Sequence, residues 1–198
     1  KSGNMKRHIP NILTLFRIAL VPVYLICLYL IGDASGALLA LIVFVVAGIT
    51  DYFDGMLARK FKSISDFGKV ADPLADKIIV SVALISIALF PMKFISIIIV
   101  IIIIFRELMV TLLRGWYQKK DIYVAANIWG KLKTTLQMIG VILALAFHAG
   151  RFRILLFQEN EELIIKGLEI FFWFVAVITI VSGITYLPFM AKKEGKED

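Results

Sequence analysis

The sequence is poor in the side chains that build disulfides and soft-metal sites, because it has one cysteine and two histidines. The single Cys27 excludes an intrachain disulfide and a cysteine-cluster metal site, and we expect it to be a small residue of the core. His8 and His148 fall at opposite membrane faces in the topology that the apolar runs predict, so they cannot complete one site. A metal centre in this chain would therefore rely on carboxylates.

We also expect no cleavable signal, and nothing in the sequence suggests an internal repeat or a disordered linker apart from the short charged tail after Met190. The first apolar run continues to membrane-spanning length without a small-residue cleavage motif. The four residues before Met5 are typical of residues left by cloning, and we exclude them. By its length the rest of the chain, residues 5–198, is expected to form a single domain. The β-branched run at residues 97–104 lacks the alternation of a barrel strand, which argues against β structure.

Apolar residues dominate the composition. They make up 60% of the chain, and the mean hydropathy is +0.89, whereas soluble domains are roughly 45–50% apolar. Six runs reach or approach the about 20 residues that a membrane-spanning helix needs. These runs are residues 11–31, 37–59, 70–90, 93–117, 126–148 and 163–190. We therefore predict an all-α membrane protein with six transmembrane helices.

The distribution of lysine and arginine predicts the orientation. Six spans put both termini on one side, and basic residues collect on the cytoplasmic side of membranes. In this chain they collect at Lys6, Arg7, Arg59, Lys60, Lys62, Lys69, Lys119, Lys120, Lys192, Lys193 and Lys196. We predict an integral protein of the bacterial cell membrane with cytoplasmic termini. The net charge of +7 reflects this bias and attraction to anionic lipid, and nucleic-acid binding is a poor interpretation of it.

Charged side chains recur at one depth in five of the predicted spans. At 1.5 Å per residue, they lie roughly 18–23 Å from the outer face of a hydrocarbon core about 30 Å thick. Charge that faces lipid at this depth is costly, whereas a water-filled cavity removes most of the cost. We therefore predict a polar cavity that opens to the cytoplasm at the level of lipid phosphates. The charged residues at this depth are Arg17, Asp51, Asp76, Arg106 and Lys133.

Four aspartates lie close together in the sequence between two apolar runs. Asp51 and Asp54 are three residues apart, and Asp72 and Asp76 are four apart, so each pair shares one face of a helix. Carboxylate oxygens without cysteine or histidine suit Mg²⁺ or Mn²⁺, and four carboxylates can hold two ions that bridge a pyrophosphate. Alternatively, Asp72 is an N-cap before Pro73, but this does not explain the other three.

The aspartates belong to the longer pattern D-x-x-D-G-x-x-A-R-x8-G-x-x-x-D-x-x-x-D. Its specified positions are filled by Asp51, Asp54, Gly55, Ala58, Arg59, Gly68, Asp72 and Asp76. The pattern resembles the signature of the CDP-alcohol phosphatidyltransferase family. The resemblance implies a homodimer with a two-metal site for a CDP-linked lipid. Asp51, Asp54 and Asp72 would be metal ligands, and Asp76 would contribute to the second metal and act as the general base.

The same resemblance implies contacts to the CDP moiety. Members of the family use a stretch before the first span and a Ser or Thr three residues before the second glycine. The implied nucleotide contacts are Ile9, Pro10, Asn11, Ile12, Gly55, Arg59, Ser65 and Gly68. Asn11 and Ser65 could equally be polar residues that face solvent.

Two further patterns, R-E-x6-R and G-K-x-K-T, resemble the phosphatidylglycerophosphate synthase branch of the family. The resemblance implies an acceptor-phosphate pocket with the candidates Arg106, Arg114, Lys131, Lys133 and Thr134. It also implies transfer of a phosphatidyl group from CDP-diacylglycerol to sn-glycerol 3-phosphate, which releases CMP. Alternatively, Arg106 and Glu107 neutralise one another and the lysines are anchors at a helix end.

Three other functions stay open from the sequence alone. The same chemistry can use another acceptor, such as inositol phosphate, serine or a second lipid. Membrane prenyltransferases also hold Mg²⁺ with aspartates, but they generally need more spans and two separate Asp-rich segments. A divalent-cation transporter would also use the aspartates as an ion site. It predicts polar residues in the outer half of the spans, which is nearly all apolar here.

Overall fold

The computed structural model describes residues 15–61, 66–118 and 128–184, with side chains throughout these ranges except at residues 52–76. Within these ranges every regular element is a helix and no residue is in a strand. The prediction of an all-α protein is therefore confirmed, and the β-branched run at residues 97–104 is helical.

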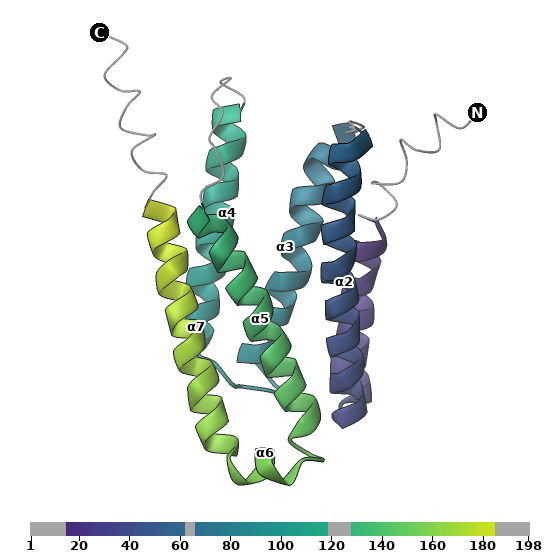
Figure 1. Ribbon diagram of the computed structural model, residues 1–198, viewed down its shortest axis with the longest axis vertical. Coiled ribbons are helices and arrows are strands. Elements are labelled where there is room, and N and C mark those ends of the chain that lie inside the picture. The colour runs from purple at the N-terminus through teal and green to yellow at the C-terminus, as the bar shows by residue number, and fades with distance from the viewer. Residues whose placement is uncertain (1–14, 62–65, 119–127, 185–198) are drawn as a thin grey trace, which may run out of the picture. The chain divides into compact units, whose positions relative to one another are not determined.

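Each of the six predicted spans corresponds to a helix (Figure 1). Residues 11–14, 126–127 and 185–190 of the predicted spans lie outside the described residues. The short helix between residues 155 and 159 was not predicted from the sequence. In chain order the elements are Leu15–Ile31, α2 (Ala34–Phe61), α3 (Asp66–Ala88), α4 (Ile97–Gln118), α5 (Ile128–Gly150), α6 (Leu155–Glu159) and α7 (Glu161–Ile184).

Three helical segments are long and apolar enough to cross a membrane. They are Ala34–Asp51, Ile128–Gly150 and Glu161–Ile184, and the segments Leu15–Ile31 and Lys77–Ala88 are apolar but shorter. Helix α4 is long enough, but Arg106, Glu107 and Arg114 interrupt its apolar sequence. The structure thus supports a membrane protein with three spanning helices in the part of the chain that it describes.

Helix α3 begins earlier than the sequence suggested. The alternative interpretation made Asp72 an N-cap and Pro73 the first helical residue. Because α3 starts at Asp66, both residues lie inside the helix, and that interpretation is wrong. Asp72 therefore does not serve to start a helix, which removes the structural explanation offered for its carboxylate.

The chain divides into two compact units, and the first comprises Lys1–Lys93 and Val141–Glu161. Its core is built from large apolar side chains that are almost fully buried, among them Tyr24, Leu28, Phe44 and Leu84. Helix α2 contacts both α3 and the last turn of the preceding segment, a π-helix over Ile26–Ile31 (Figure 1). The predicted burial of Cys27 in this core is confirmed.

Gly32 and Asp33 make the turn into α2 in the first unit. Gly32 adopts φ 67°, a left-handed conformation that favours glycine, and ends the π-helix. The Oδ1 atom of Asp33 then accepts the backbone N–H groups of Ser35 at 2.8 Å and Gly36 at 2.9 Å. These bonds satisfy donors that a helix start leaves without an intrahelical partner. The turn therefore sets where α2 begins.

The second unit comprises Phe94–Gly140 and Glu162–Asp198, so it includes α4, the first part of α5 and nearly all of α7. Its buried side chains include Phe94, Ile103 and Phe172. Helices α5 and α7 approach closely at Gly140, where an added Cβ would lie 2.8 Å from ring atoms of Phe171 and Phe172. Glycine is required here because an aromatic ring occupies the space of a side chain.

We predict that Gly140→Ala lowers the unfolding temperature of the purified protein. The added methyl group would overpack the contact with Phe172, which typically costs about 1–3 kcal/mol and exceeds the roughly 0.5–1 kcal/mol that alanine gains over glycine in a helix. The matched control is Gly167→Ala in α7, where nothing lies within 4 Å of an added Cβ. Thermal unfolding in detergent should show a lower midpoint for the first variant only. A wild-type midpoint for Gly140→Ala would contradict the packing argument.

Candidate functional site

The four predicted metal ligands lie on two helices of the first unit that contact each other. Asp51 and Asp54 belong to α2, and Asp72 and Asp76 belong to α3. The nucleotide candidates Gly55, Arg59 and Gly68 lie on the same two helices. Of these residues only Asp51 has a described side chain. The remaining nucleotide candidates, Ser65 and residues 9–12, lie outside the described residues.

Asp51 is held by an arginine from the preceding helical segment. Nη1 of Arg17 lies 2.7 Å from Oδ1 of Asp51, and the side chains are 1% and 44% exposed, respectively. A guanidinium buried this deeply needs a nearby negative charge, because an unpaired charge among apolar side chains is costly. The carboxylate is half exposed and thus accessible to a cation. The only sign of this pair in the sequence was that Arg17 and Asp51 are predicted to lie at the same depth in their membrane spans.

The chemistry of the donors at this site fits a hard divalent cation. The aspartates on α2 and α3 offer carboxylate oxygens alone, the ligands that Mg²⁺ and Mn²⁺ prefer. Among the residues with described side chains, no three His, Cys, Asp or Glu groups come together. A metal site at Asp51 thus depends on Asp54, Asp72 and Asp76, whose side chains are not among the described ones. The metal site therefore stays a prediction.

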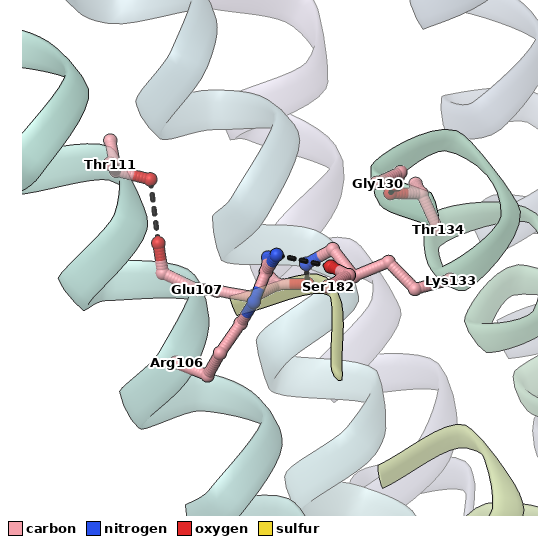
Figure 2. A network of polar contacts seen from close by, with 7 residues as sticks. All are labelled: Arg106, Glu107, Thr111, Gly130, Lys133, Thr134 and Ser182. Carbon is pink, nitrogen blue, oxygen red and sulfur yellow. Dashed lines mark hydrogen bonds and ion pairs between the residues drawn. The ribbon is translucent and has the colours of Figure 1, made fainter. Parts of the chain in front are cut away.

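A buried ion pair joins α4 and α5 in the second unit. Nζ of Lys133 lies 2.7 Å from Oε1 of Glu107, and the two side chains are only 8% and 10% exposed, respectively (Figure 2). Ionisable groups at this depth of a membrane bundle are expensive and usually functional. Lys133, a candidate for the acceptor phosphate, therefore points into the unit and already binds an oxyanion, the carboxylate of Glu107.

Arg106, next to Glu107 in α4, reaches a different helix. Its Nη2 donates a hydrogen bond to Oγ of Ser182 in α7, and both side chains are buried (Figure 2). The neighbouring Gly183 makes room for this arginine, because an added Cβ would lie 3.3 Å from the Cγ atom of Arg106. The sequence allowed Arg106 and Glu107 to neutralise one another, but each has a partner on another helix. Sequence reasoning assigned no chemistry to Ser182.

The other acceptor candidates differ in their surroundings. Arg114 is partly buried in α4, two turns after Arg106, whereas Lys131 in α5 is exposed. The hydroxyl of Thr134 donates to the carbonyl of Gly130 in its own helix at 3.1 Å. The structure thus brings Arg106 and Lys133 into buried polar contacts of one unit, and it leaves Lys131 at the surface.

Two more buried polar residues extend this polar region, and sequence reasoning missed both. Gln137 lies one turn after Lys133 in α5, and Thr179 lies three residues before Ser182 in α7. Both are fully buried, and their side-chain polar atoms have no hydrogen-bond partner among the described residues. The signal was available, since a glutamine and a threonine interrupt apolar helical sequence at about the depth of the charged residues.

Comparison with known proteins identifies relatives over nearly the whole chain. The family model described as CDP-alcohol phosphatidyltransferase matches residues 7–181. A protein of Haemophilus influenzae, named CDP-diacylglycerol–glycerol-3-phosphate 3-phosphatidyltransferase, is 38% identical over 185 residues, which cover 92% of this chain and 93% of the relative. Proteins of the same name from Bacillus subtilis and Rickettsia bellii are 37% and 33% identical, respectively. Each of these two matches covers 90% of this chain and 93% of the relative.

We predict that the Glu107–Lys133 pair is energetically coupled. Glu107→Gln or Lys133→Met alone leaves one buried charge without its partner, which typically costs about 3–5 kcal/mol. The double variant removes both charges, so its loss of stability should be much smaller than the sum of the two. Unfolding midpoints of the four proteins measure this difference.

The exposed Glu162–Lys166 pair of α7 has the same 2.7 Å separation and is the matched control. Glu162→Gln and Lys166→Met should leave the midpoint nearly unchanged, because solvent screens an exposed pair. Additive losses for the buried pair would show that the two charges do not depend on one another.

Proposed function

Because the chain belongs to the CDP-alcohol phosphatidyltransferase family, we propose that it transfers a phosphatidyl group from CDP-diacylglycerol to sn-glycerol 3-phosphate. The products are phosphatidylglycerophosphate and CMP, and the reaction belongs to phospholipid biosynthesis. One observation carries the proposal: relatives of this name are 33% to 38% identical to the chain over about nine-tenths of both sequences.

The donor half of the reaction is assigned to α2 and α3. The four aspartates would hold two ions of Mg²⁺ or Mn²⁺. Arg17 keeps the carboxylate of Asp51 in place. Bound cations would neutralise the pyrophosphate of CDP-diacylglycerol and stabilise the CMP that leaves. The nucleotide itself would contact residues 9–12 and Gly55, Arg59, Ser65 and Gly68.

Asp76 is assigned the proton transfer. The new bond forms between the hydroxyl oxygen of the acceptor and the phosphorus that carries the diacylglycerol. The bond from that phosphorus to the oxygen of CMP breaks. The hydroxyl proton passes to the carboxylate of Asp76, which makes the oxygen a better nucleophile. Asp76 lies one turn after Asp72 in α3, so the ligand and the base share one helix.

The acceptor half is assigned to the cations of the second unit. Lys133 lies 2.7 Å from a carboxylate oxygen, and an oxygen of a phosphate is the same kind of charged partner. Arg106 and Arg114 supply further positive charge on α4. Lys131 and Thr134 complete the proposed set, although Lys131 is exposed and Thr134 bonds to its own helix. An acceptor that is itself anionic, such as glycerol 3-phosphate, explains the need for several cations.

We also propose the membrane arrangement that this chemistry requires. Six spanning helices would surround a polar cavity that opens to the cytoplasm, with both termini on that side, and two copies of the chain would form a homodimer. Three helices long enough to cross, the apolar sequence of the others and the distribution of basic residues support the spans and their orientation, and the homodimer rests on the family resemblance. Acyl chains could then stay in the lipid while the headgroup reacts.

An assay with competing acceptors tests the proposed function. Purified protein with CDP-diacylglycerol and Mg²⁺ or Mn²⁺ should release CMP with glycerol 3-phosphate and not with inositol phosphate or serine. Chelation by EDTA should stop the release, and added Mg²⁺ or Mn²⁺ should restore it, because carboxylates bind the cation reversibly. CMP release with inositol phosphate but not with glycerol 3-phosphate would contradict the proposed acceptor.

Asp76→Asn tests the proposed base. The amide cannot accept the hydroxyl proton, so turnover should fall by about 10²-fold or more while binding of CDP-diacylglycerol stays measurable. The matched control is Asp33→Asn, which makes the same chemical change at the cap of α2, where asparagine also caps helices well. Normal turnover in Asp76→Asn would exclude this residue as the base.

A further inference from the structure

The segment between α5 and α7 exposes a row of large apolar side chains at one end of the first unit. We call Phe152, Ile154, Leu155 and Leu156 the linker patch. All four are exposed, and Leu155 and Leu156 are 68% and 63% exposed, respectively. Single exposed apolar residues are ordinary, but four within five positions form a patch that calls for a partner. The proposed transfer reaction makes no use of these residues.

The linker patch is exposed although the segment around it is fixed. Nη1 of Arg151 lies 3.3 Å from Oε1 of Glu161, which closes the segment on itself. Nη2 of Arg153 donates to Oγ of Ser35 at 2.9 Å, which ties the segment to the start of α2. Both contacts lie within the first unit. The exposed side chains therefore belong to an anchored piece of structure.

The opposite face of α6 provides the remaining anchor. The Phe157 ring packs against Phe147 of α5, with ring centroids 5.6 Å apart, and it lies so close to Gly150 that an added Cβ there would be 2.7 Å from a ring atom. Helix α6 thus has an inner face at Phe157 and an outer face with Leu155, Leu156 and, one turn on, the exposed Glu159. A short helix with one packed face and an outer face of leucines next to a carboxylate is suited to lie at the boundary between acyl chains and headgroups.

The position of the segment in the chain indicates which medium this is. Helices α5 and α7, which precede and follow it, are both long and apolar enough to cross a membrane (Figure 1). The segment covers only residues 151–160, so it stays at the membrane surface. Arg151 and Arg153 flank the patch, and arginines beside apolar residues are typical of the boundary between headgroups and acyl chains.

Large apolar side chains are also exposed on two helices of the first unit. Leu143 on α5 is exposed, and so are Leu38 and Leu39 on α2, one turn after the Ser35 that binds Arg153. These residues lie on helices long and apolar enough to cross a membrane. Lipid accounts for the exposed apolar side chains of these helices and of the linker patch together, whereas a protein partner bound at the linker patch accounts only for the patch.

We propose that the linker patch is inserted into the headgroup–acyl boundary of the membrane leaflet at this end of the first unit. Helix α6 then lies in the plane of the interface, with Leu155 and Leu156 toward the acyl chains and Gln158 toward water. The segment acts as an interfacial anchor that fixes how deep α5 and α7 sit in the bilayer. By the distribution of basic residues, this is the outer leaflet.

Site-directed spin labelling tests the proposal without reference to activity. A cysteine replaces Leu155 in a Cys27→Ala background, and the protein with its nitroxide is reconstituted into vesicles of phosphatidylcholine and phosphatidylglycerol. Oxygen concentrates in the bilayer, whereas a charged nickel chelate stays in water. We expect a several-fold higher ratio of oxygen to nickel accessibility for Leu155→Cys than for Gln158→Cys, the control on the same helix.

Two outcomes would overturn the proposal. Equal nickel accessibility at positions 155 and 158 would show that the patch faces water. Protection of position 155 from both reagents would show a contact with protein, such as a second copy of the chain. Leu156→Cys repeats the measurement on the same face, and an unchanged unfolding temperature confirms that each labelled protein is folded. Because no readout involves CMP release, the result is independent of the proposed function.

Discussion

The requirement that buried charge be neutralised within the protein governs this structure. Arg17 and Asp51 satisfy it in the first unit, and Glu107 and Lys133 satisfy it in the second. In each case the two charges come from different helices, so the electrostatic requirement also determines which helices are neighbours. Water would weaken such pairs, but apolar surroundings make an unpaired charge much more costly than a paired one. Residues with candidate roles in the chemistry therefore also hold the helices together.

Small residues complement the charges by letting helices and long side chains approach. Gly183 in α7 leaves space for the stem of Arg106, and Gly140 in α5 leaves space for the ring of Phe172. Close packing of this kind is the usual source of helix association where the surroundings offer no hydrophobic driving force. Many large apolar side chains are exposed on the helices, whereas Arg106, Glu107 and Lys133 are buried. This division is the one expected of helices in lipid, where buried charged groups pair within the protein.

Much of the fold could be predicted because a spanning helix leaves a long and simple signal. In the described part of the chain each of the six apolar runs contains a helix, and the four aspartates lie on two of these helices, which contact each other. The errors concern local signals that tertiary context overrides. The Asp72-Pro73 dipeptide suggested a helix start, but α3 begins at Asp66. Helix α6 was missed because its five residues, Leu155–Glu159, are too few to show a helical period in the sequence.

The sequence by itself determined the helical class, the order of the helices, the spacing of the acidic motif and the family resemblance. The tertiary structure alone decided the partners: Lys133 points inward to Glu107 while Lys131 stays exposed, and Arg106 bonds to Ser182. The physical reason is geometric. Spacing along a chain determines which residues share a face of one helix. Which residue of another helix meets that face depends on how the two helices cross and rotate, and packing across the whole unit sets both.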